Sequence, residues 1–229
     1  MEIDLREIPV FVINLEDQEP LFSYVQERLH QRGFKNVSRI LGTKHVRPYL
    51  GWALTYHHLL QSAKCPFIVL EDDADFYADA LPILEVPSDA DALYLGNSCW
   101  SVMAGHVGYY LRYKKIQGFE NIVRIYNMLS AHAILYINEE FQEEAIRIFR
   151  HSIEEETIVA DQGLAMIQRF WNVYSLNNPM FFQRPLPGRV SNTNGTTNKK
   201  IEDYISETPE LLGSSYKWGY VFRDYIIRP

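Results

Sequence analysis

The strongest constraint on this chain is a run of apolar residues that ends in a cluster of carboxylates. Residues 66–76 read PFIVLEDDADF, so an apolar, β-branched run leads directly into four acidic residues within five positions, Glu71, Asp72, Asp73 and Asp75. A run of this length and composition predicts a buried strand. Neighbouring carboxylates repel one another, so a fold that keeps them together favours a cation between them.

Carboxylate oxygens suit a hard divalent cation such as Mn²⁺ or Mg²⁺. In an open α/β sheet, ligands bind at the carboxyl ends of the strands, which is where this cluster lies. We therefore predict a metal site that serves a phosphate-bearing substrate, with Glu71, Asp73 and Asp75 as candidate ligands. The alternative is a solvated acidic loop that closes a core strand. The buried-strand context and the density of acids favour the site.

The order of apolar runs before the cluster predicts an α/β fold. A continuous apolar strand at 8–15 precedes a helix at 21–32, which ends at a glycine, and a second strand at 37–41. A helix at 51–63 then leads into the strand that carries the acids. This β-α-β-α-β succession predicts a mixed, mostly parallel central sheet with helices on both faces.

After the cluster, short strands and helices alternate. Asp161 stands near the start of the last predicted helix, where a carboxylate suits the positive helix end, and simple capping is its alternative role. The pattern predicts a short helix at 79–84, a strand at 92–95, an antiparallel hairpin within 107–125 that turns at 114–118, a strand at 131–137, and helices at 139–151 and 159–170.

Composition fits one globular domain and argues against some partners. At 229 residues the chain can hold one α/β core, and its net charge of −7 argues against a general affinity for nucleic acid, which needs a concentrated basic face. The two cysteines make no disulfide framework, the N-terminus does not read as a signal peptide, and no apolar run approaches the length of a membrane span. We expect a cytoplasmic protein of bacterial or viral origin, and the sequence leaves its oligomeric state open.

A long polar loop near the C-terminus is the remaining feature. It is rich in Pro, Gly, Asn, Ser and Thr, and it is either a lid that orders on ligand binding or a solvated linker. Arg189, Ser191, Lys199 and Lys200 would give it phosphate-binding groups. We accordingly expect a single domain with a nucleotide-sugar-binding half at 1–100, an acceptor-side half at 101–185, the mobile loop at 186–200 and a C-terminal cover at 201–229.

Six motifs in succession resemble those of glycosyltransferase family 25, which contains lipopolysaccharide-biosynthesis and procollagen galactosyltransferase-type enzymes. The resemblance covers most of the chain up to about residue 186, and the order of the motifs makes it specific. They are VINL in the first strand, GWALTYHHLLQ in the helix before the acids, IVLEDDADF at the acids, and then DALYLG, SAHAILYI and VADQGL.

The resemblance implies a GT-A fold, a Rossmann-like sheet that binds a nucleotide-sugar, with Mn²⁺ held by an acidic motif of Asp-X-Asp type. The family's Glu-Asp-Asp corresponds to residues 71–73, so Asp73 would bind the metal and Asp72 would face the ribose. Asp73-Ala74-Asp75 is also a literal Asp-X-Asp, so the pairs Glu71/Asp73 and Asp73/Asp75 both remain open.

The chain departs from the family in two places. Glu19-Pro20 stands where the family has a basic pair after its first strand. The family's Ser-His before the acids aligns with Thr55-Tyr56, which shifts His57 and His58 by one or two positions. A shift of one residue turns a helical side chain by about 100°. We therefore expect these two histidines to be packing or surface residues. His132 matches its family position better.

We expect a metal-dependent glycosyltransferase that moves a hexose, such as galactose or glucose, from a UDP-linked donor to a glycan or glycolipid hydroxyl with inversion. The resemblance points to Asp161 as general base, with the acidic run at 154–156 as an alternative. Asn14, Leu15 and Thr43 would contact the nucleotide, and Lys44 would add positive charge as the diphosphate departs.

Two other classes of function remain open. A metal-dependent phosphohydrolase or nucleotidyltransferase also places carboxylates at strand ends, but the chain has no phosphate-binding glycine-rich loop of Walker or dinucleotide form. A non-catalytic carbohydrate-binding protein could retain the fold, although the intact acid cluster argues against it. The fold alone does not decide among them.

Overall fold

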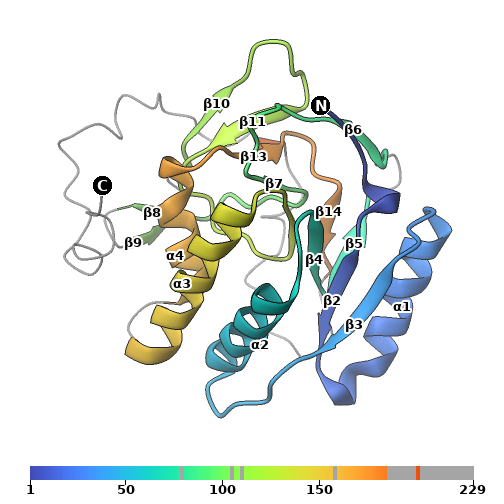
Figure 1. Ribbon diagram of the computed structural model, residues 1–229, viewed down its shortest axis with the longest axis vertical. Helices are drawn as coiled ribbons and strands as arrows, with labels where there is room; N and C mark the ends of the chain where they lie inside the picture. Colours follow the sequence, from blue (N-terminus) through green and yellow to red (C-terminus); the bar gives the residue numbers. More distant parts are fainter. Residues whose placement is uncertain (78–79, 104–105, 109–110, 157–158, 185–199, 202–229) are drawn as a thin grey trace.

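An eight-stranded mixed sheet with helices on both faces forms the body of the protein in the computed structural model (Figure 1). The structure describes the chain except residues 78–79, 104–105, 109–110, 157–158, 185–199 and 202–229. The predicted C-terminal cover, apart from residue 201, and the predicted loop, apart from Lys200, therefore lie outside the described residues, as do Arg189 and Ser191. The predicted α/β class is confirmed.

Six of the eight strands run in one direction, and only β11 and β12 oppose them, so the sheet is mostly parallel as predicted. From one edge to the other the sheet contains β10 (Tyr113–Lys115), β11 (Ile122–Ile125), β13 (Val173–Leu176), β7 (Ala92–Tyr94), β12 (Ala133–Tyr136), β4 (Phe67–Glu71), β2 (Val10–Asn14) and β3 (Val37–Leu41).

The opening β-α-β-α-β succession has the predicted parallel arrangement. Helix α1 (Glu19–Gln31) connects β2 to β3, and α2 (Pro48–Ser62) connects β3 to β4. Strand β2 lies between β3 and β4 and is parallel to both. Because Ile13 pairs with Glu71 in this register, the carboxyl end of β2 lies directly beside the first residue of the acid cluster.

Alternation along the central strands divides the core into two layers. In β4, Phe67 and Val69 pack on the side that carries α2, α3 (Glu139–Glu155) and α4 (Ala160–Ile167). Ile68 and Leu70 pack on the side that carries α1. Figure 1 shows the same division, with α2, α3 and α4 grouped together and α1 apart from them. A strand buried on both faces reads as a continuous apolar run, which is why the strands were recognisable in the sequence.

Two-stranded sheets flank the main sheet, and one of them corrects a prediction. The predicted helix at 79–84 is wrong throughout its described residues, 80–84, none of which is helical, and Ile83 and Leu84 belong to a strand that pairs with the N-terminal strand. The partner strand satisfies backbone groups that a helix would have satisfied locally. The small sheets are β1 (Glu2–Asp4) with β6 (Ile83–Glu85), β5 (Ala74–Phe76) with β14 (Phe181–Gln183), and β8 (Ser101–Met103) with β9 (His106–Gly108).

The predicted hairpin within 107–125 is present only in part, as β10 and β11. Val107, at the start of the predicted first arm, pairs with Val102 in β8 instead. Lys114 and Lys115 belong to the first arm, where they pair with Arg124 and Val123, so the predicted turn at 114–118 is wrong at its start.

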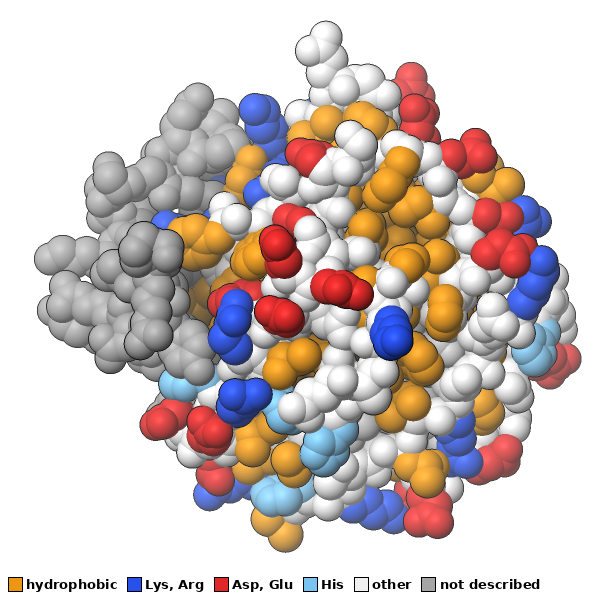
Figure 2. Space-filling model, in the orientation of Figure 1, with side chains coloured by type: hydrophobic (Ala, Val, Ile, Leu, Met, Phe, Trp, Pro, Cys, Tyr) orange, Lys and Arg blue, Asp and Glu red, His pale blue; other side chains and the backbone are white. Residues whose placement is uncertain are grey.

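In the view of Figure 2, the Lys and Arg side chains of the described residues are scattered among acidic ones. Within the described residues, no helix is long and apolar enough to cross a membrane.

Candidate functional site

A cavity of about 800 Å³ opens at the carboxyl ends of β2 and β4. Its walls come from the end of β2, the loop after β3, the first half of α2 and the acid cluster. Seven of the residues that the sequence singled out line it together: Asn14, Leu15, Thr43, Lys44, Glu71, Asp72 and Asp73.

The end of β2 orients Asp72 through a chain of hydrogen bonds. Asn14 Nδ2 donates to Asp72 Oδ2 at 2.8 Å and to the carbonyl of Gln18 at 2.8 Å. Arg39 Nε in turn donates to Asn14 Oδ1 at 2.8 Å. Asn14 and Asp72 are both buried, so these bonds fix the Asp72 carboxylate in one direction.

Glu71 is held at both carboxylate oxygens. Trp52 Nε1 donates to Oε1 at 3.0 Å, and Gln183 Nε2 donates to Oε2 at 3.2 Å. Burial, followed by the neighbouring charge of Asp73, raises the pKa of Glu71 to about 8. The cluster therefore resists carrying all of its negative charge at once, which is the condition that a bound cation would relieve.

Asp75 lies apart from this cavity. It accepts hydrogen bonds from Tyr24 Oη at 2.7 Å and from Arg28 Nε at 3.1 Å, and both donors come from α1. Asp75 is buried, so its carboxylate serves to tie β5 to α1. The structure thus brings Glu71 and Asp73 into one cavity and places Asp75 outside it.

The carboxylates in this cavity suit a cation that the protein coordinates only in part. Among the described residues, no group of three or more His, Cys, Asp or Glu side chains is arranged to hold a metal ion. Mg²⁺ in phosphate-binding sites is commonly held by one or two carboxylates and completes its coordination with substrate phosphate and water. Glu71 and Asp73, in the same cavity, fit that pattern.

A second cavity of about 450 Å³ adjoins the first, and Asp161 lines it. Helix α4 carries Asp161 in its first turn. The Oδ1 atom of Asp161 is enclosed and has no hydrogen-bond partner in the part of the chain that the structure describes. Burial raises the pKa of Asp161 above its usual value. Glu71 and Trp52 line both cavities, so they form the wall between them.

Several residues of the site were not predicted from the sequence. Trp52 and Gly51 lie in a recognised motif, but only the structure shows that a Cβ atom on Gly51 would stand 2.2 Å from the carbonyl oxygen of Thr43. This close approach lets the loop after β3 pack on α2, where Thr43 N–H donates to Thr55 Oγ1 at 2.8 Å. Gln183 had no local signal, because it reaches Glu71 from a strand 112 residues later.

His57, His58 and His132 lie in packing or surface positions. His58 is exposed and His57 is half-buried, which confirms the expectation for both. His132 is buried, with Nδ1 at 2.9 Å from Ser130 Oγ, and burial lowers its pKa to about 4. Its carbonyl accepts the N–H of Glu71 at 3.0 Å. A neutral His132 therefore supports the strand end that carries Glu71.

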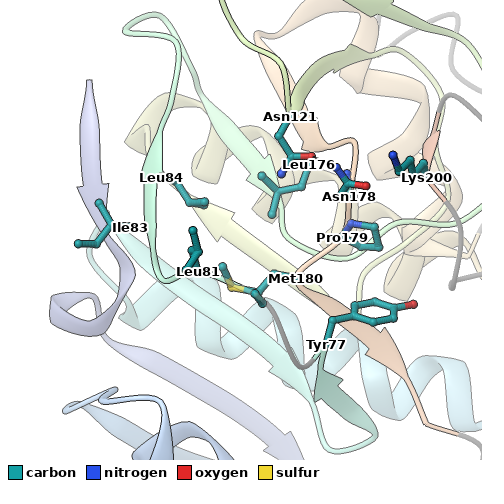
Figure 3. A pocket seen from close by; sticks show the side chains of 11 residues that line it. Tyr77, Leu81, Ile83, Leu84, Asn121, Leu176, Asn178, Pro179, Met180 and Lys200 are labelled. Carbon is teal, nitrogen blue, oxygen red and sulfur yellow. Dashed lines mark hydrogen bonds between the residues drawn. The ribbon is translucent and has the colours of Figure 1, made fainter.

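A third cavity, of about 600 Å³, lies away from the carboxylates (Figure 3). Leu84 and Met180 give it apolar walls, and Asn121 and Asn178 lie at one side. These two asparagines already bond to each other, with Asn178 Nδ2 donating to Asn121 Oδ1 at 2.8 Å. Lys200, which the sequence predicted as a phosphate-binding group, lines this cavity, away from the acid cluster.

Comparisons with known proteins show only distant likeness. No protein-family model matches the chain, and no curated protein matches it. A nucleoside-diphosphate-sugar pyrophosphorylase from Vibrio cholerae superposes with a TM-score of 0.37 and 15% identity, over 72% of this chain and 70% of that one. CTP:phosphocholine cytidylyltransferase from Streptococcus pneumoniae superposes with a TM-score of 0.39 and 8% identity, over 77% and 93%. Similarity this low assigns no function.

Proposed function

We propose that this protein is a metal-dependent glycosyltransferase that moves a hexose from a UDP-linked donor to a hydroxyl of a glycan or glycolipid, with inversion. The observation that carries the proposal is the pair of adjoining cavities. One has carboxylates at strand ends, the other contains the buried carboxylate of Asp161, and Glu71 and Trp52 form their shared wall. Transfer between two substrates needs two such spaces with one junction.

The larger cavity is the proposed donor site. Its volume of about 800 Å³ lies in the range of small-molecule pockets. Asn14, Leu15 and Thr43 would contact the nucleotide, and the fixed carboxylate of Asp72 would accept hydrogen bonds from the ribose. Lys44 now pairs with Asp17 at 3.0 Å on the exposed rim. An exposed pair contributes about 0–1 kcal/mol, so Lys44 could exchange Asp17 for phosphate at little cost.

Glu71 and Asp73 are the proposed ligands of Mn²⁺ or Mg²⁺. The cation would supply the positive charge that the diphosphate needs as it departs. Asp75 is not needed for this role, because its carboxylate is paired with α1. Arg189 and Ser191, which lie outside the described residues, remain proposed phosphate contacts from the loop that contains them.

The smaller cavity is the proposed acceptor site, and Asp161 is the proposed general base. Its enclosed Oδ1 atom is available to accept the proton of an acceptor hydroxyl. A raised pKa makes the ionised carboxylate a stronger base, which favours proton abstraction near neutral pH. The hydroxyl oxygen would attack the anomeric carbon from the side opposite the diphosphate, and the bond to the diphosphate would break as the new bond forms. Attack from that side inverts the anomeric carbon.

Turnover of nucleotide-sugars with and without Mn²⁺ tests the proposal. We would offer UDP-, GDP- and CMP-sugars to the wild-type protein and to Asp73→Asn, and measure release of the nucleotide. Asp75→Asn is the matched control, because it makes the same chemical change two residues away on a carboxylate outside the cavity. We expect release from UDP-hexoses that needs both Mn²⁺ and Asp73 and survives in the control.

The same assay separates the rival reactions. Pyrophosphate release from UTP and a hexose 1-phosphate would identify a nucleotidyltransferase, and phosphate release from simple phosphate esters would identify a phosphohydrolase. A strict need for acceptor could hide turnover, so binding of UDP and UDP-hexoses is measured by calorimetry in parallel. Absence of both binding and turnover would refute the proposed glycosyl transfer.

A further inference from the structure

Trp52 lies in the motif GWALTYHHLLQ, but only the structure shows its position between the two cavities. It is one of two residues, with Glu71, that line both cavities. Any group that passes from a molecule in one cavity to a molecule in the other must cross the junction that these two side chains form. The nature of the side chain at that junction therefore constrains the group that is transferred.

Two aromatic rings and one hydrogen bond hold the indole ring of Trp52 in place. Its centroid lies 4.8 Å from the ring of Tyr56 and 5.3 Å from that of Phe149. Tyr56 and Phe149 are fully buried and stack on each other with an interplanar angle of 6°. The indole N–H is fixed as well, because it donates to Glu71 Oε1 at 3.0 Å. Such a ring is a preorganised flat surface rather than a mobile side chain.

The junction combines an aromatic surface with hydrogen-bond acceptors at its edge. Each Glu71 oxygen accepts one bond, from Trp52 or from Gln183, and a carboxylate oxygen has capacity for a second. A pyranose ring has a matching character, since its C–H groups give one face an apolar surface while its hydroxyl groups lie around the rim. Aromatic rings contribute binding energy beyond their buried area when such a face packs on them.

We infer that Trp52 is a specificity-determining residue of this site, and that the pyranose ring of the donor stacks on its indole at the junction of the two cavities. The inference rests on the proposed function and adds the group that the junction holds. With the ring there, its anomeric carbon lies between the carboxylates that serve the diphosphate and the Asp161 side of the site.

The test compares affinities for UDP and for a UDP-hexose in the presence of Mn²⁺. The measured quantity is the dissociation constant for UDP divided by that for the UDP-hexose. This ratio isolates the contribution of the sugar to binding. Trp52→Leu removes the ring, and Trp52→Phe retains a ring while removing the N–H that bonds Glu71. Trp171→Leu is the matched control, because Trp171 is another partly buried tryptophan packed on the same core and lines neither cavity.

We expect Trp52→Leu to lower the sugar-dependent ratio roughly three- to tenfold, while any change in its affinity for UDP alone is matched by Trp52→Phe, which loses the same bond to Glu71. Trp52→Phe should retain most of the ratio, and Trp171→Leu all of it. A loss of UDP binding in Trp52→Leu that exceeds the loss in Trp52→Phe, or an unchanged ratio, overturns the inference. An equal loss in Trp52→Phe also overturns it, because the N–H bond to Glu71 would then account for the effect. Failure of the wild-type protein to bind UDP or UDP-hexoses overturns the proposed function itself.

Discussion

Replacing Glu71 by glutamine should stabilise the cation-free protein at alkaline pH, because ionisation of the wild-type carboxyl group is unfavourable in the folded protein. Burial and the charge of Asp73 raise the pKa of Glu71 from 4.5 to about 8. In the unfolded chain the same group ionises near its ordinary value. Between these two pKa values the folded state retains a proton that the unfolded state has released, so the free energy of unfolding falls as pH rises.

The size of this effect follows from the shift. At about 1.4 kcal/mol per pKa unit, the shift corresponds to at most ~5 kcal/mol of lost stability above pH 8. Glu71 keeps partial exposure toward the cavity, where solvent screens its charge, so we expect roughly half of that. Glutamine would also place its amide nitrogen opposite Gln183 Nε2, which costs about 1 kcal/mol unless one amide rotates. The net gain for Glu71→Gln is then about 1–2 kcal/mol near pH 8.5.

Chemical denaturation between about pH 5 and pH 9, in the presence of a chelator, measures this difference. Below about pH 6.5 the lowered pKa of His132 makes both proteins more stable as pH rises, so the measured quantity is the difference in stability between them. Relative to Glu71→Gln, the wild-type protein should lose stability as pH rises through this window. The two curves should therefore cross, with glutamine no better than glutamate at the acidic end. Near pH 8.5 the gain corresponds to a rise of roughly 2–8 °C in the midpoint of thermal unfolding for a domain of this size.

Asp73→Asn provides the control for the electrostatic part of the argument. It removes the neighbouring charge without exposing Glu71, so the pKa of Glu71 in the folded protein falls, and the loss of stability becomes smaller and ends at a lower pH. Mn²⁺ at pH 8.5 should stabilise the wild-type protein more than either variant. A wild-type stability that does not fall relative to that of Glu71→Gln as pH rises, or a Glu71→Gln effect of equal size at every pH, would refute the reasoning.

Three further variants and one control test separate parts of the site. Asp161→Asn should slow sugar transfer roughly 100- to 10,000-fold with unchanged affinity for UDP, and weakened UDP binding would count against its role as base. Asp75→Asn should lower stability by about 1–3 kcal/mol, because it weakens the bonds to α1, yet leave the Mn²⁺ dependence of turnover intact; a changed metal requirement would restore Asp75 as a ligand. Gly51→Ala places a Cβ atom 2.2 Å from the carbonyl oxygen of Thr43. It should cost about 1–3 kcal/mol and weaken UDP binding, as calorimetry would show. Gly163→Ala on α4, whose Cβ would meet a core side chain at 2.4 Å, should lower stability but not UDP affinity; equal UDP binding by the two variants would contradict a role for the loop.

Much of the fold was predictable because its signals are local. Strands β2 and β4 are buried on both faces, so they appear as unbroken apolar runs, and the helices between them have periodic apolar positions. The same locality placed the acid cluster at a strand end and Asp161 at a helix start. In both cases a few adjacent residues determine where along the strand or helix the carboxylate stands.

Tertiary structure decided which of these groups act together. The sequence does not distinguish Asp73 from Asp75 as candidate metal ligands. In the structure, pairing of β5 with β14 places Asp75 against Tyr24 and Arg28 of α1 instead of in the cavity. Ile83 and Leu84 form a strand only because β1 supplies a partner. The contacts of Glu71 with Trp52 and Gln183 span 19 and 112 residues. Burial, partner strands and shared cavity walls are properties of the packed chain, and no short stretch of sequence contains them.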